Sequence, residues 1–130
     1  MSLQLVNMDR CCADAGWKMA DELWKNKKDG KPETHITKSL GVLQEDGLYA
    51  FFLYQLKEDF FGKIVQKHCH NFLRNSPISL ITKEIDDDLQ AVRDLTGNLS
   101  NMMLAKSLLE KILIYTRYHL KAKEKAGDQH

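Results

Sequence analysis

The chain of 130 residues is 43% hydrophobic and 28% charged, and it has a formal net charge of +1. This length and apolar content predict one domain with a single core, and the near-neutral total argues against a strongly basic nucleic-acid binder. The charge is nevertheless uneven: positions 106–125 hold six basic and two acidic residues, and positions 83–94 hold two basic and five acidic ones. A near-neutral chain of this kind can still present one positive face.

The cysteines and the apolar runs indicate the cellular compartment in which the protein is expected. Cys11, Cys12 and Cys69 make an odd number, which does not suit a disulfide framework. No basic-then-apolar leader is recognisable at the N-terminus, and the apolar runs are short. We therefore expect a cytoplasmic protein without a membrane span.

An amphipathic helix is predicted over about residues 5–28, because apolar residues recur mostly at three- and four-residue steps. These residues are Leu5, Met8, Cys12, Ala13, Gly16, Met19, Ala20 and Leu23. The opposite face carries Arg10, Asp14, Lys18, Asp21, Lys25 and Lys28. Residues 29–32 predict a polar loop.

Three helices are expected between residues 34 and 74. Thr34 is the expected N-cap of a helix over about 34–45, and Ile36, Leu40 and Leu43 form its apolar side. Gly47 predicts the end of that helix, because the residue just past the last turn often needs a positive φ. An aromatic run predicts a helix at about 48–57, and a further helix covers about 60–74. The inward side chains of the latter are Phe61, Ile64, Val65, Cys69, Phe72 and Leu73.

The last part of the chain predicts more helices. Ser76 and Pro77 suit the N-cap and first position of a short one. Another begins at Asp86–Asp88, runs to about Leu95 and is closed by Gly97. The last helix spans about 98–125. Its inward set is Leu99, Met102, Ala105, Leu109, Ile112, Leu113, Thr116 and Leu120.

No segment shows the two-residue alternation that is typical of strands. The expected fold is all-α, a compact bundle of about five to six helices with long first and last helices. We predict one helical domain over residues 1–125 and a flexible C-terminal tail over residues 126–130.

For the histidines and cysteines, a structural role is a better interpretation than metal binding or thiol chemistry. On a helix, His68 and His70 point about 200° apart, so they cannot both face one ion. Cys11 and Cys12 lack the gap of a zinc half-site. We expect a buried Cys69 flanked by exposed histidines. We predict no metal, no cofactor and no enzymatic activity, because no motif pairs a cysteine with His35, His68, His70 or His119.

Two other groups also have structural interpretations. Asp86, Asp87 and Asp88 lack the ligand spacing of a calcium loop, so capping of a helix N-terminus is preferred. The aromatic residues suit either base stacking or core packing, and we favour packing, with Tyr118 as the expected exposed one. They are Trp17, Trp24, Tyr49, Tyr54, Tyr115 and Tyr118.

Basic stripes on the first and last helices are the feature that points most clearly to a partner. Arg117, Lys121 and Lys125 are four residues apart, and Lys18, Lys25 and Lys28 fall roughly along one side of the first helix. Such stripes are either solvated faces or contacts to a phosphate backbone. The glycines are isolated, so a glycine-rich phosphate cradle is not expected.

Three features then follow one another in a recognisable order. An early arginine precedes small residues at 10–15, a short helix leads through Gly47 into an aromatic helix that ends at Lys57, and the last helix carries Tyr115 and Arg117 before further basic residues. From about residue 10 to residue 123, the chain resembles the small all-helical subunit of the Cmr complex, a type III-B CRISPR RNA-guided effector.

The resemblance implies a non-catalytic subunit that helps to hold the guide–target RNA duplex in antiviral defence. Its implied partners are other Cmr subunits, guide and target RNA, and further copies of itself in a short filament. The expected RNA-binding residues are Arg10, Lys18, Lys25, Lys57, Arg117 and Lys121. The alternative is a helical adaptor that binds only protein, through an exposed aromatic such as Trp24 or Tyr118.

Overall fold

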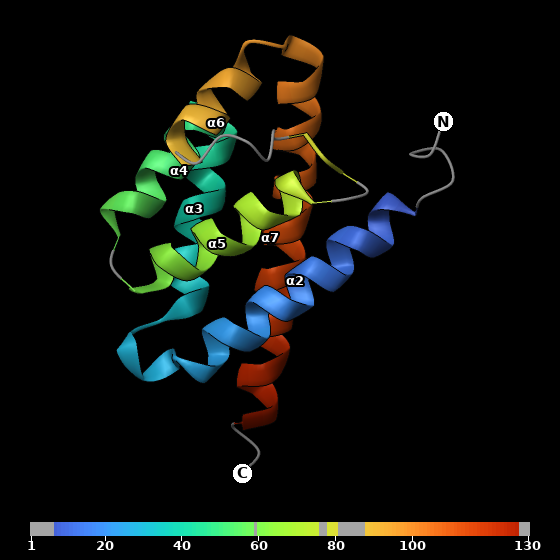
Figure 1. Ribbon diagram of the computed structural model, residues 1–130. Coiled ribbons are helices and arrows are strands. Elements are labelled where there is room, and N and C mark those ends of the chain that lie inside the picture. The colour runs from blue at the N-terminus through green and yellow to red at the C-terminus, as the bar shows by residue number, and fades with distance from the viewer. Residues whose placement is uncertain (1–6, 59, 76–77, 81–87, 128–130) are drawn as a thin grey trace.

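The computed structural model describes residues 7–58, 60–75, 78–80 and 88–127, and within these residues the fold is all-α (Figure 1). Its α-helices are α2 (Met8–Lys25), α3 (Pro32–Asp46), α4 (Leu48–Lys57), α5 (Phe60–Arg74), α6 (Asp88–Thr96) and α7 (Leu99–Gly127), with a short 3-10 helix η1 (Lys27–Asp29). The predicted fold class is confirmed. Among the described helices, none has an apolar stretch long enough to cross a bilayer.

The first described helix is shorter than predicted. The Asn7 side chain caps α2 by accepting a hydrogen bond from the Arg10 N–H at 3.0 Å. The helix ends at Lys25, because the Asn26 N–H turns back to the Leu23 carbonyl. The predicted apolar stripe is buried at Cys12, Gly16, Met19, Ala20 and Leu23, and Met8 packs against the core, whereas Ala13 is only half-buried. Its first member, Leu5, lies outside the described residues.

The start of α3 corrects the prediction at residues 29–34. Pro32 begins α3 and Lys31 is its N-cap, so Thr34 lies inside the first turn instead of capping it. Proline suits this position because its fixed φ is already helical and its missing N–H would have had no helical acceptor. The predicted glycine turn is confirmed: Gly47 has φ +100°, ends α3 and precedes α4 directly.

The long helix α7 organises the core (Figure 1). Both α2 and α3 pack against it, and α4 joins α3 to α5. Where α2 crosses α7, a Cβ added to Gly16 would lie 2.8 Å from the Tyr115 Cβ. The buried side chains include Met19, Leu23, Ile36, Leu43, Phe51, Phe52, Val65, Leu73, Leu109, Ile112, Leu113 and Leu120.

At the ends of several helices, the structure differs from the prediction or does not describe the predicted residues. Leu99, expected inside, is 67% exposed. Ser76, Pro77, Asp86 and Asp87 lie outside the described residues, and α6 is described from Asp88. Helix α7 continues to Gly127, and residues 128–130 lie outside the described part. The domain limit at residue 125 stays a prediction.

Candidate nucleic-acid interface

Basic side chains gather where the C-terminal end of α2, η1, the start of α3 and the last turns of α7 meet, at the bottom of Figure 1. We call this region the basic end. Its basic residues are Lys25, Lys27, Lys28, Lys31, Arg117, Lys121, Lys123 and Lys125. The acidic residues of the same segments are Asp21, Glu22, Asp29, Glu33 and Glu124, so eight basic residues stand against five acidic ones.

Glu33 of α3 joins two of the predicted RNA-binding residues. Its Oε2 lies 3.9 Å from the Arg117 Nε and 3.7 Å from the Lys121 Nζ, both on α7. The two basic side chains remain 39% and 47% exposed. One carboxylate therefore balances only half of the positive charge that it touches.

Asp21 makes the same kind of contact between α2 and α7. Its carboxylate lies 3.1 Å from the Lys25 Nζ and 3.6 Å from the Lys123 Nζ. The Lys25 hydrogen bond is the main cause that lowers the pKa of Asp21. Because these ion pairs are exposed, each contributes little to stability, and the lysines can exchange partners readily.

A cavity of about 330 Å³ opens within the basic end. Its apolar lining comes from Trp24, Pro32 and Leu120, and its remaining lining residues are Lys27, Gly30, Lys31, Glu33, Thr34 and Glu124. The Lys27 Nζ lies 4.6 Å from the centroid of the Trp24 ring, a cation–π contact. The cavity thus combines an aromatic wall with nearby positive charge.

The other three predicted RNA-binding residues lie elsewhere. Arg10 is in the first turn of α2, 80% exposed and 4.0 Å from Asp14. Lys18 is exposed in the middle of α2. Lys57 ends α4, with its Nζ 3.4 Å from the Glu58 carboxylate and 5.3 Å from the Tyr54 ring. The structure therefore gathers Lys25, Arg117 and Lys121 but not these three, whose roles stay predictions.

Sequence reasoning missed Lys27 and Lys31 as candidate contacts. Both line the cavity, beside α7 residues that are about ninety positions away in the chain. The available signal was local: four lysines fall within residues 25–31. Lys31 falls in the predicted loop at residues 29–32, and Lys27 lies within the predicted helix but off its charged stripe.

Both histidines of α5 are less exposed than predicted, since His68 is half-buried. His70 is buried, not exposed, and its ring lies edge-on to Phe52 with centroids 6.3 Å apart. The His68 Nε2 lies 2.7 Å from the Glu22 Oε1, which also accepts from Lys67. Among the described residues, no group of three or more His, Cys, Asp or Glu side chains is placed to hold a metal ion.

Two of the three thiols, those of Cys12 and Cys69, are buried. Cys69 is fully buried, as predicted, and burial raises the pKa of its thiol. Burial also raises the pKa of Cys12 to about 11, and its Sγ lies 3.7 Å from the Leu108 carbonyl. Because the thiolate is the nucleophile, a raised pKa disfavours the reactive form of these two groups.

The aromatic residues divide as follows. Tyr118 is exposed, as predicted, whereas Trp17 is 53% exposed against the expectation of packing. Trp24, Tyr49 and Tyr115 pack against the core. Trp17 follows the buried Gly16 by one residue, so its side chain leaves α2 about 100° away from that of Gly16 around the helix.

Comparison with protein-family models, with curated proteins and with solved structures finds no match to this chain.

Proposed function

We propose that this protein is a non-catalytic small subunit of a Cmr-type RNA-guided effector, in which the basic end contacts the phosphate backbone of the guide–target RNA duplex. The observation that carries the proposal is the meeting of Lys25, Lys31, Arg117 and Lys121 at one end of the bundle. The resemblance of the sequence to the Cmr small subunit supplies the assembly in which that surface would act.

Contacts of this kind recognise the backbone of an RNA duplex and not its base sequence. Exposed lysines act as point charges on phosphates, and the narrow major groove of RNA hides the base edges. Sequence specificity in such an effector comes from base pairing, as it does in other RNA-guided proteins. The subunit needs only to add positive charge at a fixed place.

The test compares two double charge reversals with the same change in net charge. Lys31→Glu with Lys121→Glu alters the basic end, whereas Lys38→Glu with Arg93→Glu alters exposed residues on α3 and α6. We expect the first pair to weaken RNA-duplex binding at low salt by about tenfold or more, and the second pair to have little effect.

Binding is followed by the anisotropy of a labelled duplex, and circular dichroism checks that both variants stay helical. Equal losses for the two pairs would show that binding depends on net charge and not on the basic end. A reconstituted effector that bound target RNA equally well without this protein would contradict the assignment to the complex.

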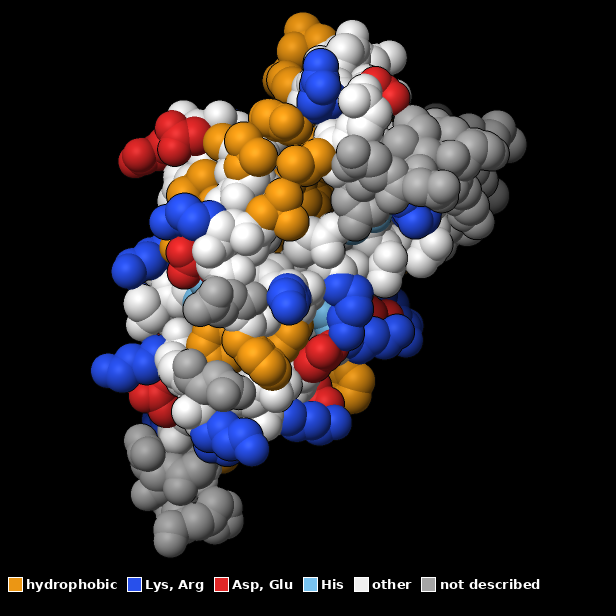
Figure 2. Space-filling model, turned by 60° about the vertical axis from the view of Figure 1, so that its left-hand side comes forward, with side chains coloured by type: hydrophobic (Ala, Val, Ile, Leu, Met, Phe, Trp, Pro, Cys, Tyr) orange, Lys and Arg blue, Asp and Glu red, His pale blue; other side chains and the backbone are white. Residues whose placement is uncertain are grey.

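Exposed apolar side chains favour a second candidate, a protein-only adaptor. Leu53 and Leu56 on α4, Phe60 on α5, and Met103 on α7 are each more than 40% exposed. Figure 2 shows hydrophobic side chains gathered over the upper half of the molecule, and a smaller hydrophobic patch in the lower half among basic side chains. Association that does not weaken with salt, together with no retention of RNA at low salt, would identify the adaptor.

A further inference from the structure

The cavity in the basic end is a concave feature from whose lining the proposed backbone contact uses Lys31 alone. Its volume of about 330 Å³ falls at the lower end of the range for small-ligand sites, about 300–1,000 Å³. A duplex backbone meets a convex or flat basic surface and has no group to insert into a cavity of this size. An unpaired nucleotide has such a group.

The lining suits a base attached to a charged backbone. Trp24 offers a flat aromatic surface, and Pro32 and Leu120 complete the apolar part. Lys27 and Lys31 supply positive charge at the rim. Thr34 and Glu124 add hydrogen-bonding groups of the kind that contact base edges in single-stranded RNA.

The acidic residues of the lining do not cancel this positive charge. The Glu33 carboxylate is already close to Arg117 and Lys121, at 3.9 and 3.7 Å. Glu124 is exposed and belongs to a segment that also carries Lys121, Lys123 and Lys125. A phosphate next to the cavity therefore meets a net positive surface.

We propose that this cavity takes one unpaired RNA base, which stacks on Trp24 in place of the Lys27 ammonium and leaves Lys27 and Lys31 to pair with the flanking phosphates. The inference rests on the proposed function. The exchange is favourable because an exposed cation–π contact is weaker than base–aromatic stacking, and Lys27 gains a phosphate in return. The ligand class is thus single-stranded RNA, including the unpaired nucleotides of an interrupted duplex.

The first test uses the emission of Trp24 itself. The chain has two tryptophans, so the Trp17→Phe variant leaves Trp24 as the sole fluorophore. We expect hexaadenylate RNA to quench this emission at saturation, and a fully paired RNA duplex to bind without quenching it. This measurement leaves the cavity unchanged, so it does not depend on whether a variant at Trp24 folds.

The second test measures affinity with a matched control. Trp24→Leu should weaken the binding of hexaadenylate by about tenfold and leave duplex binding within about twofold, because stacking contributes to the former alone. Trp17→Leu, on the same helix, should change neither affinity.

The outcomes separate this inference from the proposed function. Binding of hexaadenylate without quenching, or equal losses for Trp24→Leu and Trp17→Leu, would overturn the base site while the backbone contact stands. No binding of either RNA by the wild-type protein at low salt would overturn both.

Discussion

At the scale of single residues, a buried polar chain lies between α3 and α4. The His35 Nε2 lies 2.8 Å from the Gln55 Oε1, and the Gln55 Nε2 donates to the Ser39 Oγ at 2.9 Å. All three side chains are buried, and the imidazole stacks on Tyr54 with ring centroids 5.7 Å apart. A neutral imidazole that donates from Nε2 satisfies every bond in this chain.

This arrangement predicts a loss of stability in acid. Burial is the main cause that lowers the pKa of His35 below its usual value of about 6.5. The unfolded chain therefore binds the proton more readily than the folded one. The contribution of His35 to stability is complete above about pH 6.5 and is lost as the pH falls toward the lower folded pKa.

The measurement is urea unfolding at about pH 7.5 and about pH 5.5, for the wild type and for His35→Gln. The free energy of unfolding should fall more between these two pH values in the wild type than in the variant, since glutamine does not titrate. Equal decreases in the two proteins would show that other groups cause the pH dependence.

Burial of individual residues was only partly predictable from the sequence. A helical repeat identifies one apolar face, and it correctly placed Cys69 and Leu73 inside. It missed His70 because α5 is covered by α2 on one side and by α4 on another, which buries more than one face. It wrongly buried Leu99 because the first turn of α7 lies beyond the helices that cover the rest of it.

At the scale of elements, α2 and α7 approach each other closely where they cross, although they are distant in sequence. The Thr116 Oγ1 donates to the Ile112 carbonyl at 2.7 Å, and a Cβ at Gly16 would lie 3.1 Å from that carbonyl oxygen. Near the N-terminal end of α2, Asp9 accepts hydrogen bonds from Tyr115 and Lys111. The Tyr115 bond, followed by that of Lys111, lowers the pKa of Asp9.

Two glycine substitutions test this crossing. Gly16→Ala should destabilise the protein by about 1–3 kcal/mol, because the added Cβ meets backbone atoms of α7 that cannot give way without moving the helix. Gly41→Ala lies in the interior of α3, where a Cβ has no neighbour within 4 Å among the described residues. It should stabilise by about 0.5–1 kcal/mol, since alanine is the better helix former.

Thermal or urea unfolding measures the stability of the two variants relative to the wild type. Stabilisation by both alanines would mean that α2 and α7 are farther apart than the structure places them.

Element boundaries were predictable where the chain carries a local stop signal. The helices at 48–57 and 60–74 match α4 and α5 in their first and last residues, and Gly47 fixes the start of the former through its positive φ. The start of α3 was misplaced because Thr34 and Pro32 both suit a helix N-terminus. Only the backbone geometry shows that Pro32 takes the first helical position.

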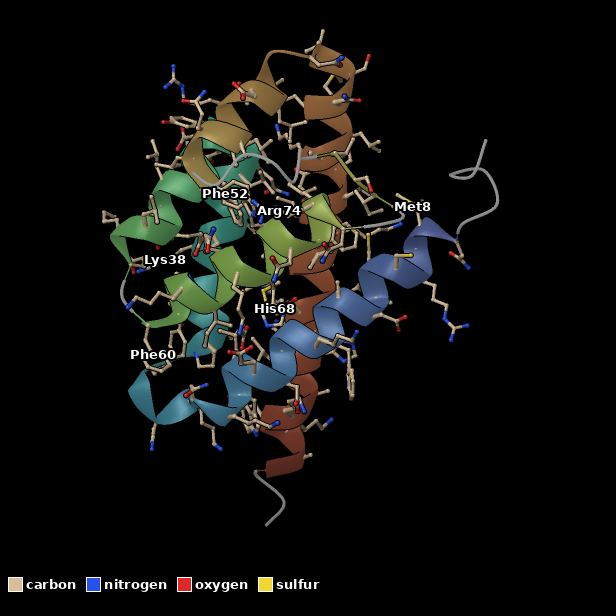
Figure 3. The ribbon with its side chains drawn as sticks, viewed as in Figure 1. Met8, Lys38, Phe52, Phe60, His68 and Arg74 are labelled. Atoms are coloured by element: carbon tan, nitrogen blue, oxygen red, sulfur yellow. The ribbon has the colours of Figure 1, made fainter. Side chains whose placement is uncertain are left out.

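At the scale of the whole molecule, basic side chains are concentrated at one end of the bundle. The basic end joins residues of α2, η1, α3 and α7, whereas Glu45 and Asp46 lie exposed at the opposite end of α3. Figure 3 shows the labelled Lys38 on the side of the molecule and away from the end of α7, which makes it a suitable control position. Self-association in a filament stays a prediction.

The basic end itself was only half predictable. The sequence identifies the charge bias of residues 106–125 and the stripe on the first helix. It cannot show that the end of α2 meets the last turns of α7, because that contact depends on the angle at which the helices cross at Gly16. The cavity beside Trp24 is lined by residues from segments that are distant in the chain, so no local sequence pattern predicts it.

The most direct test of the central claim is to map where RNA touches the protein. A guide–target RNA duplex carrying 4-thiouridine is crosslinked to the wild-type protein at low salt, and the crosslinked peptides are identified by mass spectrometry. Contact at the basic end predicts crosslinks within residues 21–34 and 117–125, and their loss in Lys31→Glu with Lys121→Glu. Crosslinks confined to α4, α5 and α6, or unchanged crosslinks in that variant, would contradict the claim.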